Sequence, residues 1–190
     1  MPVDVFLAAC DAPDEPDPDR APLDAALAAA GIRAAWPAWS DPDIDWSEPA
    51  VCFPRATWDY HFDLLGFLRW AEHVDSVTRL RNRLEVIRWN THKSYMVSLE
   101  EAGVATVPTE VVSCGASTSI DDVRALRGWD NVVIKPAVSC ASWEAHLVGE
   151  GESGTRVWSR LVGERDMLVQ PFMPSVRTLG SVPLLSSTAR

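Results

Sequence analysis

Lysine is nearly absent from this sequence, and the two lysines that remain are the first candidates for chemistry. The chain has 17 basic residues, and all of them except Lys93 and Lys135 are arginine. Arginine serves wherever positive charge alone is wanted, whereas lysine offers a compact ammonium that a planar guanidinium does not reproduce. The scarcity therefore favours a specific role for both lysines. Chance survival in a GC-biased gene is the alternative that composition leaves open.

Lys135 stands where a positive charge needs a partner. It follows the apolar run V-V-I, and Pro136 then ends the hydrogen-bonding ladder of the expected strand. An ammonium in apolar surroundings costs free energy unless it meets an anion or reaches water. A bound polyphosphate would be such an anion, so we hypothesise a phosphate site here. The alternative is a strand-edge lysine whose stem lies on apolar surface while its charge reaches solvent.

A second candidate site follows an expected strand at residues 50–55, in the segment R-A-T-W-D-Y. The carboxyl ends of sheet strands are where α/β folds usually bind ligands. We therefore predict that Arg55, Trp58, Asp59 and Tyr60 line a substrate pocket. A buried aromatic turn is the alternative.

No metal site is predicted in this chain. His73, His92 and His146 lack metal-ligand spacing. The stretch 11–19 is rich in aspartate, but its prolines and its lack of glycine favour a solvated turn. The four cysteines lie far apart without a C-x-x-C pair, so we expect reduced core thiols.

Alternating strands and helices are expected to position these residues. Short apolar, β-branched runs predict strands, and helix start and stop signals predict the helices between them. The alternation favours a parallel sheet covered by helices. We therefore predict an α/β fold that begins with a Rossmann-like domain at residues 1–80. Its expected strands are 3–9, 32–39 and 50–55, and its expected helices are 20–30 and 62–73.

A second α/β unit is predicted at residues 81–176, with strands short enough for a mixed or antiparallel sheet. Asn90 is expected to cap a helix that Gly103 ends, and Ser119 to cap another that reaches residue 127. The final stretch, 177–190, follows neither a helical nor a strand period and is treated as an atypical tail. The remaining expected elements are strands at 107–112, 132–134, 147–148 and 167–169, and a helix at 153–162.

Composition excludes several classes of protein. The formal net charge is -10 with a pI near 4.8, which argues against nucleic acid as a partner, because a phosphate backbone requires a basic surface. No apolar run is long enough to cross a bilayer, so no membrane association is expected. Asp4 stands where a secretory signal would carry basic residues, and we expect a cytoplasmic protein.

Four segments together resemble the ATP-grasp superfamily. They read R-W-N-T-H-K-S-Y-M-V-S-L-E-E-A-G-V-A-T-V-P-T at 88–109, V-V-I-K-P-A-V-S at 132–139, M-L-V-Q-P-F-M-P-S-V at 167–176 and R-A-T-W-D-Y at 55–60. Within the superfamily these segments are similar to a bacterial branch that includes the ATP-dependent cyclase of cycloserine biosynthesis, and the segment at 55–60 also resembles that branch. The resemblance thus spans nearly the whole chain up to residue 176.

The resemblance implies an ATP site and a ligase reaction. Lys93 and Lys135 match the two lysines that reach the nucleotide phosphates and the adenine side of the pocket. Gln170, Pro171, Phe172 and Met173 match the segment that recognises the adenine edge. Relatives join a carboxylate to an amine, or close a ring, through an acyl-phosphate made with ATP and Mg²⁺. The implied partners are ATP and a small carboxylate or amino-acid-like substrate.

Two departures from the family pattern limit this expectation. The loop at 137–143 contains no glycine, although backbone amides approach phosphate most closely where side chains are absent. No Asp or Glu follows Asp166, so the carboxylates that hold Mg²⁺ in the family are missing. We therefore expect this chain to be an ATP-grasp protein that was truncated by a frameshift or an early stop near Thr178. It would bind ATP, carry no catalytic residue, react weakly or not at all, and self-associate through its exposed edge.

Two other hypotheses stay open. One is a nucleotide-sensing or partner-binding α/β module that has kept the ATP pocket without the chemistry. The other is a plain α/β domain in which Lys93 and Lys135 are incidental.

Overall fold

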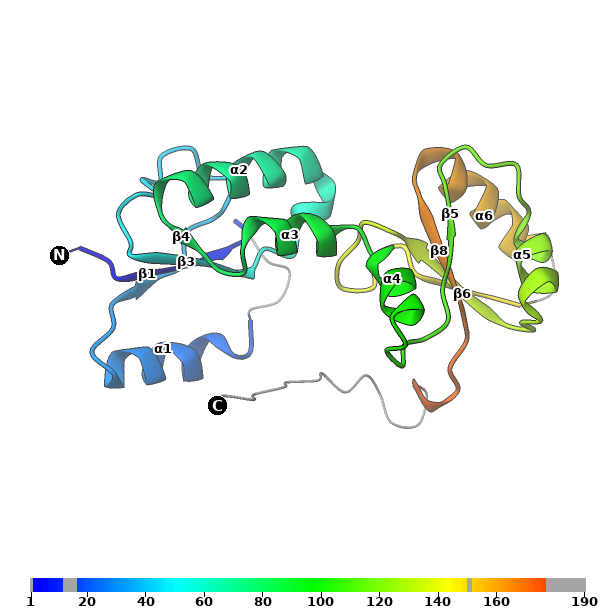
Figure 1. Cartoon of the computed structure of the whole chain (residues 1–190), viewed down its shortest axis with the longest axis horizontal. Helices are drawn as coiled ribbons and strands as arrows, with labels where there is room; N and C mark the ends of the chain where they lie inside the picture. The colour runs from blue at the N-terminus through cyan, green and yellow to red at the C-terminus, as the bar shows by residue number, and fades with distance from the viewer. Residues whose placement is uncertain (1, 12–16, 150–151, 177–190) are drawn as a thin grey trace.

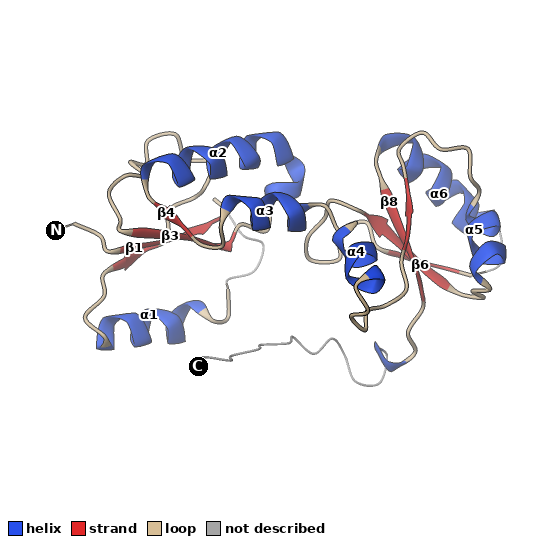
Figure 2. Cartoon of the chain, viewed as in Figure 1, coloured by secondary structure: helices blue, strands red, loops and turns tan. Residues whose placement is uncertain are grey.

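The computed structural model describes residues 2–11, 17–149 and 152–176, which form two lobes, each built on its own four-stranded sheet (Figure 1). We call residues 2–91 the parallel lobe and residues 92–176 the antiparallel lobe. The two lobes lie side by side along the long axis, and the short connection between α3 and α4 joins them (Figure 2). No helix in the described part of the chain has the length and apolar character needed to cross a membrane.

The sheet of the parallel lobe has the order β2-β1-β3-β4, and every neighbouring pair is parallel. This arrangement confirms the α/β fold with a parallel first sheet. Helix α1 lies on one side of the sheet, and α2 and α3 lie on the other (Figure 1). The elements are β1 Val5–Ala9, α1 Arg20–Ala29, β2 Ala34–Ala35, β3 Val51–Ala56, η1 Tyr60–Phe62, α2 Leu64–Val77, β4 Arg79–Leu80 and α3 Leu84–Thr91.

Tryptophan and phenylalanine side chains fill the core between this sheet and α2. Trp46 meets the rings of Phe6 and Trp70 edge-on, with centroids 5.5 and 5.2 Å apart. Trp39 meets Phe67 in the same way at 5.4 Å. Such edge-to-face pairs stabilise a core by about 0.5–1.5 kcal/mol each beyond the apolar area that they bury. Three of the six tryptophans in residues 2–91, Trp39, Trp46 and Trp70, are therefore packed in this core.

The sheet of the antiparallel lobe has the order β5-β8-β6-β7, and all of its pairs are antiparallel. Helices α5 and α6 cover one face, where their apolar side chains form a second core around Trp158, while α4 lies on the other side (Figure 1). Ser119 caps α5 in a capping box with Asp122, as the sequence predicts. The elements are α4 Tyr95–Glu101, β5 Glu110–Val112, α5 Ile120–Arg127, β6 Val132–Pro136, β7 His146–Val148, α6 Glu152–Glu164 and β8 Met167–Pro171.

The prediction of one helix from Asn90 to Gly103 is wrong. Asn90 lies inside α3, and the chain leaves the helical conformation around His92 before α4 begins. At this break the Lys93 amide donates to the carbonyl of Ala137 at 2.8 Å, and the ring of His92 bonds the Ser94 hydroxyl, also at 2.8 Å. A tertiary hydrogen bond to Ala137 and a local bond between His92 and Ser94 therefore take the place of helical bonds at this point of the chain.

Other differences concern the ends of the sheets. The strand expected at 32–39 is only the two-residue β2, and the strand expected at 107–112 begins at Glu110. The short strand β4 and helix α3 were not predicted. The boundary at residue 80 stays a prediction, and the tail at 177–190 lies outside the described residues.

Candidate functional site

The register of the second sheet decides which side chains share its face away from α5 and α6. Lys135 pairs with Leu168, and Val133 pairs with Gln170. Because directly paired residues of antiparallel strands point to the same side, these four side chains share one face. Their neighbours along β6 and β8 point into the core with α5 and α6. Lys135 therefore projects from a sheet face that it shares with the apolar Val133 and Leu168 and with the polar Gln170.

Lys135 is half-buried on this face, and burial lowers the pKa of its ammonium below the ordinary value. Desolvation is the cause, because removing water penalises the charged form. The structure thus realises the situation expected from the sequence, in which a lysine lies in apolar surroundings and an anion would compensate its charge.

Lys93 approaches the same place from the break between α3 and α4. Its ammonium contacts the carbonyl oxygen of Ser139 and lies 3.5 Å from the hydroxyl of Tyr60. Burial lowers the pKa of Lys93, the nearby Cys140 thiol opposes that shift, and the charge of Lys135 adds to it. The two lysines, 42 positions apart in the sequence, are therefore close enough to influence each other electrostatically.

A cavity of about 390 Å³ opens beside Lys93, between the two lobes. Tyr60, Asn90 and Thr91 line it from the parallel lobe, and Ser139 and Cys140 line it from the antiparallel lobe. Such a volume can hold a small ligand, because ligand sites begin at about 300 Å³.

Tyr60 links the two lobes at this cavity. Its hydroxyl lies 3.1 Å from the carbonyl oxygen of Ser139 and 3.4 Å from that of Thr91. Burial raises the pKa of Tyr60 to about 12, so the hydroxyl keeps its proton at neutral pH and can donate to a carbonyl. Tyr60 and Lys93 thus both contact the backbone of Ser139.

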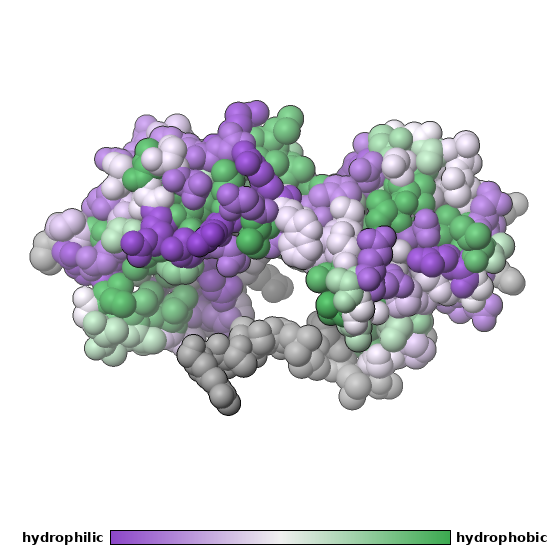
Figure 3. All heavy atoms as spheres, viewed as in Figure 1, coloured by the Kyte–Doolittle hydropathy of each residue, from purple (hydrophilic) through white to green (hydrophobic). Residues whose placement is uncertain are grey.

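Aromatic side chains extend this contact between the lobes. Trp143 packs on His61 and Phe62, with ring centroids 4.9 and 5.6 Å away, and the guanidinium of Arg165 lies 4.9 Å from its ring. Phe62 and Leu65 are each 68% exposed, and hydrophobic atoms gather at this end of α2 on the surface (Figure 3).

The loop at 137–143 lacks glycine, but it still enters the left-handed region of backbone conformation. Ala141 has φ 48° and Ser142 has φ 61°, and Glu144 follows with φ 52°. Residues with a side chain rarely adopt these angles, because the Cβ atom crowds the following carbonyl. Tertiary contacts therefore hold this loop in a conformation that glycine would adopt more easily.

Asp166 holds three segments of the site together and was not singled out in the sequence. Its carboxylate accepts from the Cys114 amide at 2.7 Å and lies 3.2 Å from Nε2 of His92. Its own carbonyl accepts from the Ala137 amide at 2.8 Å. His92 precedes Lys93 and Ala137 begins the loop, so Asp166 fixes both sides of the lysine pair. The contact to His92 spans 74 positions, and no local pattern indicates it.

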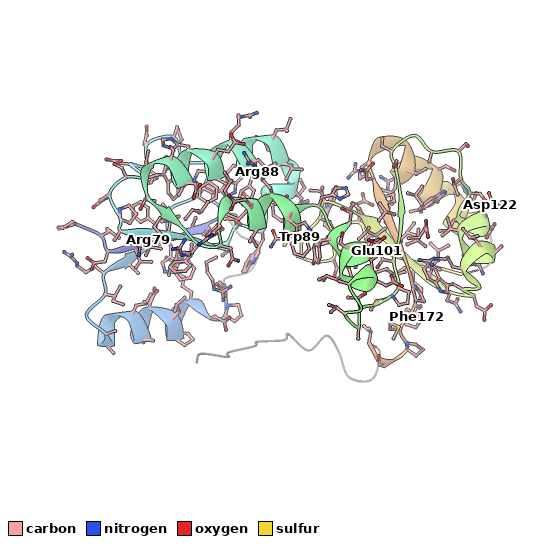
Figure 4. All side chains as sticks on the ribbon, viewed as in Figure 1. Arg79, Arg88, Trp89, Glu101, Asp122 and Phe172 are labelled. Carbon is pink, nitrogen blue, oxygen red and sulfur yellow. The ribbon has the colours of Figure 1, made fainter. Side chains whose placement is uncertain are left out.

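The segment expected to recognise adenine does not present its four side chains on one surface. Gln170 is 6% exposed and donates to the Thr109 hydroxyl at 2.8 Å. Phe172 lies where the chain leaves β8, and its amide donates to the Asn131 carbonyl at 2.8 Å (Figure 4). Met173, by contrast, is 42% exposed.

The four residues expected to bind substrate lie in different surroundings. The guanidinium of Arg55 pairs with Asp19 at 2.6 Å and with Asp17 at 3.4 Å. Asp59 accepts from the indole nitrogen of Trp39 at 2.7 Å. Of these four residues, only Tyr60 lines the cavity beside Lys93.

Trp58 lines a separate cavity of about 360 Å³ at the carboxyl ends of β1 and β3, together with Cys10. The structure therefore does not gather the four predicted substrate residues into one pocket, and their role stays a prediction.

Within residues 2–11, 17–149 and 152–176, no group of three or more His, Cys, Asp or Glu side chains is arranged to hold a metal ion.

Comparison with known proteins finds similar sequences and folds. Residues 5–82 match the family described as D-cycloserine synthetase DcsG, N-terminal domain. The cycloserine biosynthesis protein DcsG of Streptomyces lavendulae is 31% identical over 174 residues, covering 88% of this chain and 58% of that protein. The chain therefore spans less than two thirds of the length of this curated relative.

Two solved structures resemble the whole fold. The crystal structure of D-cycloserine synthetase DcsG matches with a TM-score of 0.85 at 29% identity, covering 93% of this chain and 61% of that one. The RimK domain protein ATP-grasp from Sphaerobacter thermophilus matches with a TM-score of 0.66 at 19% identity, covering 90% and 64%. The first extends the similarity beyond the N-terminal domain, and the second supports the fold.

Proposed function

We propose that the chain is an ATP-grasp ligase of the branch that contains D-cycloserine synthetase, and that it binds ATP through Lys93 and Lys135. The matches to that protein and to its N-terminal domain support this proposal. One observation carries the proposal. The only two lysines of the chain lie at one end of the antiparallel sheet: the Lys93 amide donates to the carbonyl of Ala137, two residues after Lys135, and burial lowers the pKa of both side chains. A polyphosphate would compensate both charges.

The surroundings of the two lysines suggest which phosphate of ATP each lysine would bind. Lys135 is fixed on β6 and reaches the open sheet face, whereas Lys93 lies at the lobe junction against the carbonyl of Ser139. That carbonyl is a weaker partner for an ammonium than a phosphate oxygen. We propose that Lys93 exchanges it for the phosphate nearest the cavity, while Lys135 binds a phosphate nearer the base.

The base would then lie along the sheet toward Gln170, with Pro171, Phe172 and Met173 at its edge. Val133 and Leu147, which are paired across β6 and β7, supply an apolar surface on the same face. A flat base binds well to such a surface while a few polar atoms set its orientation.

We further propose that the family's ligase chemistry is the reaction this site serves. An oxygen of a substrate carboxylate would attack the γ-phosphorus of ATP, the bond to the β,γ-bridging oxygen would break, and ADP would leave. An amine would then attack the acyl carbon of the acyl-phosphate and release phosphate. A divalent cation would neutralise phosphate charge when bound. The lysines would hold the phosphates in line during the first step.

The cavity beside Lys93 is the proposed place for the small carboxylate or amino-acid-like substrate. It adjoins the ammonium that would hold the reacting phosphate, and Tyr60 offers a protonated hydroxyl there. Arg55 and Asp59 are less suited, because each already pairs with another side chain of the protein.

Isothermal titration calorimetry of the 190-residue chain with ATP, with and without Mg²⁺, tests the proposal. The parent should bind ATP, and a Lys93→Met, Lys135→Met double variant should not. Arg156→Met is the matched control, because it removes a positive charge from α6 on the opposite side of the sheet. Equal binding by the parent and the double variant would refute the site. Release of ADP from the same samples tests the expectation that turnover is slow or absent.

A further inference from the structure

Two consecutive hydrogen bonds connect the backbone of the antiparallel lobe to the side chain of Gln170. The hydroxyl of Thr109 lies 2.8 Å from the carbonyl oxygen of Val107. The amide nitrogen Nε2 of Gln170 lies 2.8 Å from the same hydroxyl oxygen. The two side chains are nearly inaccessible, with 2% of Thr109 and 6% of Gln170 exposed.

The chemistry of these groups fixes the direction of both bonds. A backbone carbonyl can only accept, so the one hydroxyl proton of Thr109 is committed to Val107. The hydroxyl oxygen must therefore accept its second bond, and only the NH₂ end of the Gln170 amide can donate it. Sulfur Sδ of Met96, a weak acceptor 3.4 Å from Nε2, favours the same orientation.

The direction of these two hydrogen bonds fixes the orientation of the Gln170 side-chain amide, so that its oxygen Oε1 remains available as an acceptor. Its oxygen Oε1 points away from Thr109 and can accept a hydrogen bond, while the amide cannot turn to offer a donor without breaking the bond to Thr109. Gln170 shares its sheet face with Val133 and Lys135. A base bound along this face, as proposed above, would therefore meet an acceptor at Gln170.

We propose that Thr109, through Gln170, is a specificity-determining positioning residue that selects purine nucleotides with an amino group at position six over those with an oxo group. The proposal rests on the ATP site described above. The six-amino group of adenine would donate a hydrogen bond to Oε1 of Gln170. A six-oxo purine would instead place its oxygen, which is also an acceptor, next to Oε1. Without a compensating hydrogen bond, that arrangement costs free energy.

The test compares ATP with inosine triphosphate, which differs from ATP only at position six and in the attached N1 proton. Dissociation constants for both are measured by calorimetry on the full chain, on Thr109→Val and on Thr109→Ser. Valine keeps the shape of threonine and removes the hydroxyl, so the amide of Gln170 is free to turn. Serine keeps the hydroxyl and is the matched control.

The parent and Thr109→Ser should favour ATP by about tenfold or more, the value of one hydrogen bond. Thr109→Val should lose most of this preference, through weaker ATP binding and unchanged or tighter binding of inosine triphosphate. An equal loss of affinity for both nucleotides in Thr109→Val would show a merely structural role and overturn the proposal.

The parent alone also provides a test that requires no variant to fold. A parent that binds both nucleotides equally would overturn the role of Thr109 and Gln170 and leave the ATP site standing. A parent that binds neither nucleotide would overturn both proposals.

Discussion

Replacing Lys135 with methionine removes an ammonium from the open face of the second sheet and keeps a flexible side chain of similar shape. We expect opposite effects on the free and the bound protein. The free protein should become more stable, because burial disfavours the charged form of Lys135. ATP binding should weaken, because the charge that a phosphate would meet is gone.

Both magnitudes can be estimated. Full burial of an ion costs several kcal/mol, but Lys135 keeps part of its water, so the gain should be about 1 kcal/mol. For a chain of this size that shifts the midpoint of thermal unfolding by roughly 2–4 °C. Loss of a charge-assisted hydrogen bond costs about 1.5–3 kcal/mol, which weakens ATP binding roughly 10- to 150-fold.

Thermal unfolding monitored with and without ATP measures both effects in one experiment. The Lys135→Met curve should begin above the parent without nucleotide and move less when ATP is added. Arg156→Met should follow the parent in both conditions. A variant that unfolds at a lower temperature than the parent and responds equally to ATP would refute the reasoning, because Lys135 would then be a stabilising surface residue.

Three further predictions follow from the site. Tyr60→Phe should lower the free energy of unfolding by about 1 kcal/mol in urea titrations, because the Ser139 carbonyl at the lobe junction loses one of its two donors and keeps only Lys93. Asp166→Ala should cost about 1–3 kcal/mol in the same assay, since the Cys114 amide and the ring of His92 lose their acceptor, and Asp166→Asn should recover part of it. Lys93 and Lys135 have lowered pKa values in the folded state. Between those pKa values and about 10.5 the unfolded chain therefore binds more protons than the folded chain, so the free energy of unfolding rises with pH. The cost of burying the two ammonium groups thus becomes smaller as pH rises. The stability advantage of the double lysine-to-methionine variant should therefore shrink from pH 7 toward pH 10.5, measured as the difference between its unfolding midpoint and that of the parent.

The parts of the fold that local chemistry determines could be predicted from the sequence. Ser119 begins a helix because its side chain accepts from the backbone three residues later, and this signal needs only neighbouring residues. Gly103, with φ 79°, follows α4 for a similar reason. The break between α3 and α4 could not be predicted, because it depends on a hydrogen bond from Lys93 to Ala137, 44 positions away.

Some residues of the candidate site could likewise be predicted from the sequence, and others could not. Lys93 and Lys135 were found because their residue type is rare in this chain, which is a property of the sequence alone. Asp166 was missed because its partners Cys114 and His92 lie 52 and 74 positions away in the sequence, and Ser139 was missed because Tyr60 reaches it from the parallel lobe. The grouping of Arg55 with Tyr60 was suggested by sequence proximity, and the strand end turns the two side chains toward different neighbours.

The convergence of the only two lysines also makes the site easy to label. An amine-reactive reagent, such as an acyl ester, meets only these two side-chain amines and the α-amino group in the whole chain. Because burial shifts both ammonium groups toward their neutral and nucleophilic form, they should react at a lower pH than ordinary lysines wherever the reagent can reach them. The mass of the intact chain after labelling would then count how many of the two amines a bound nucleotide protects.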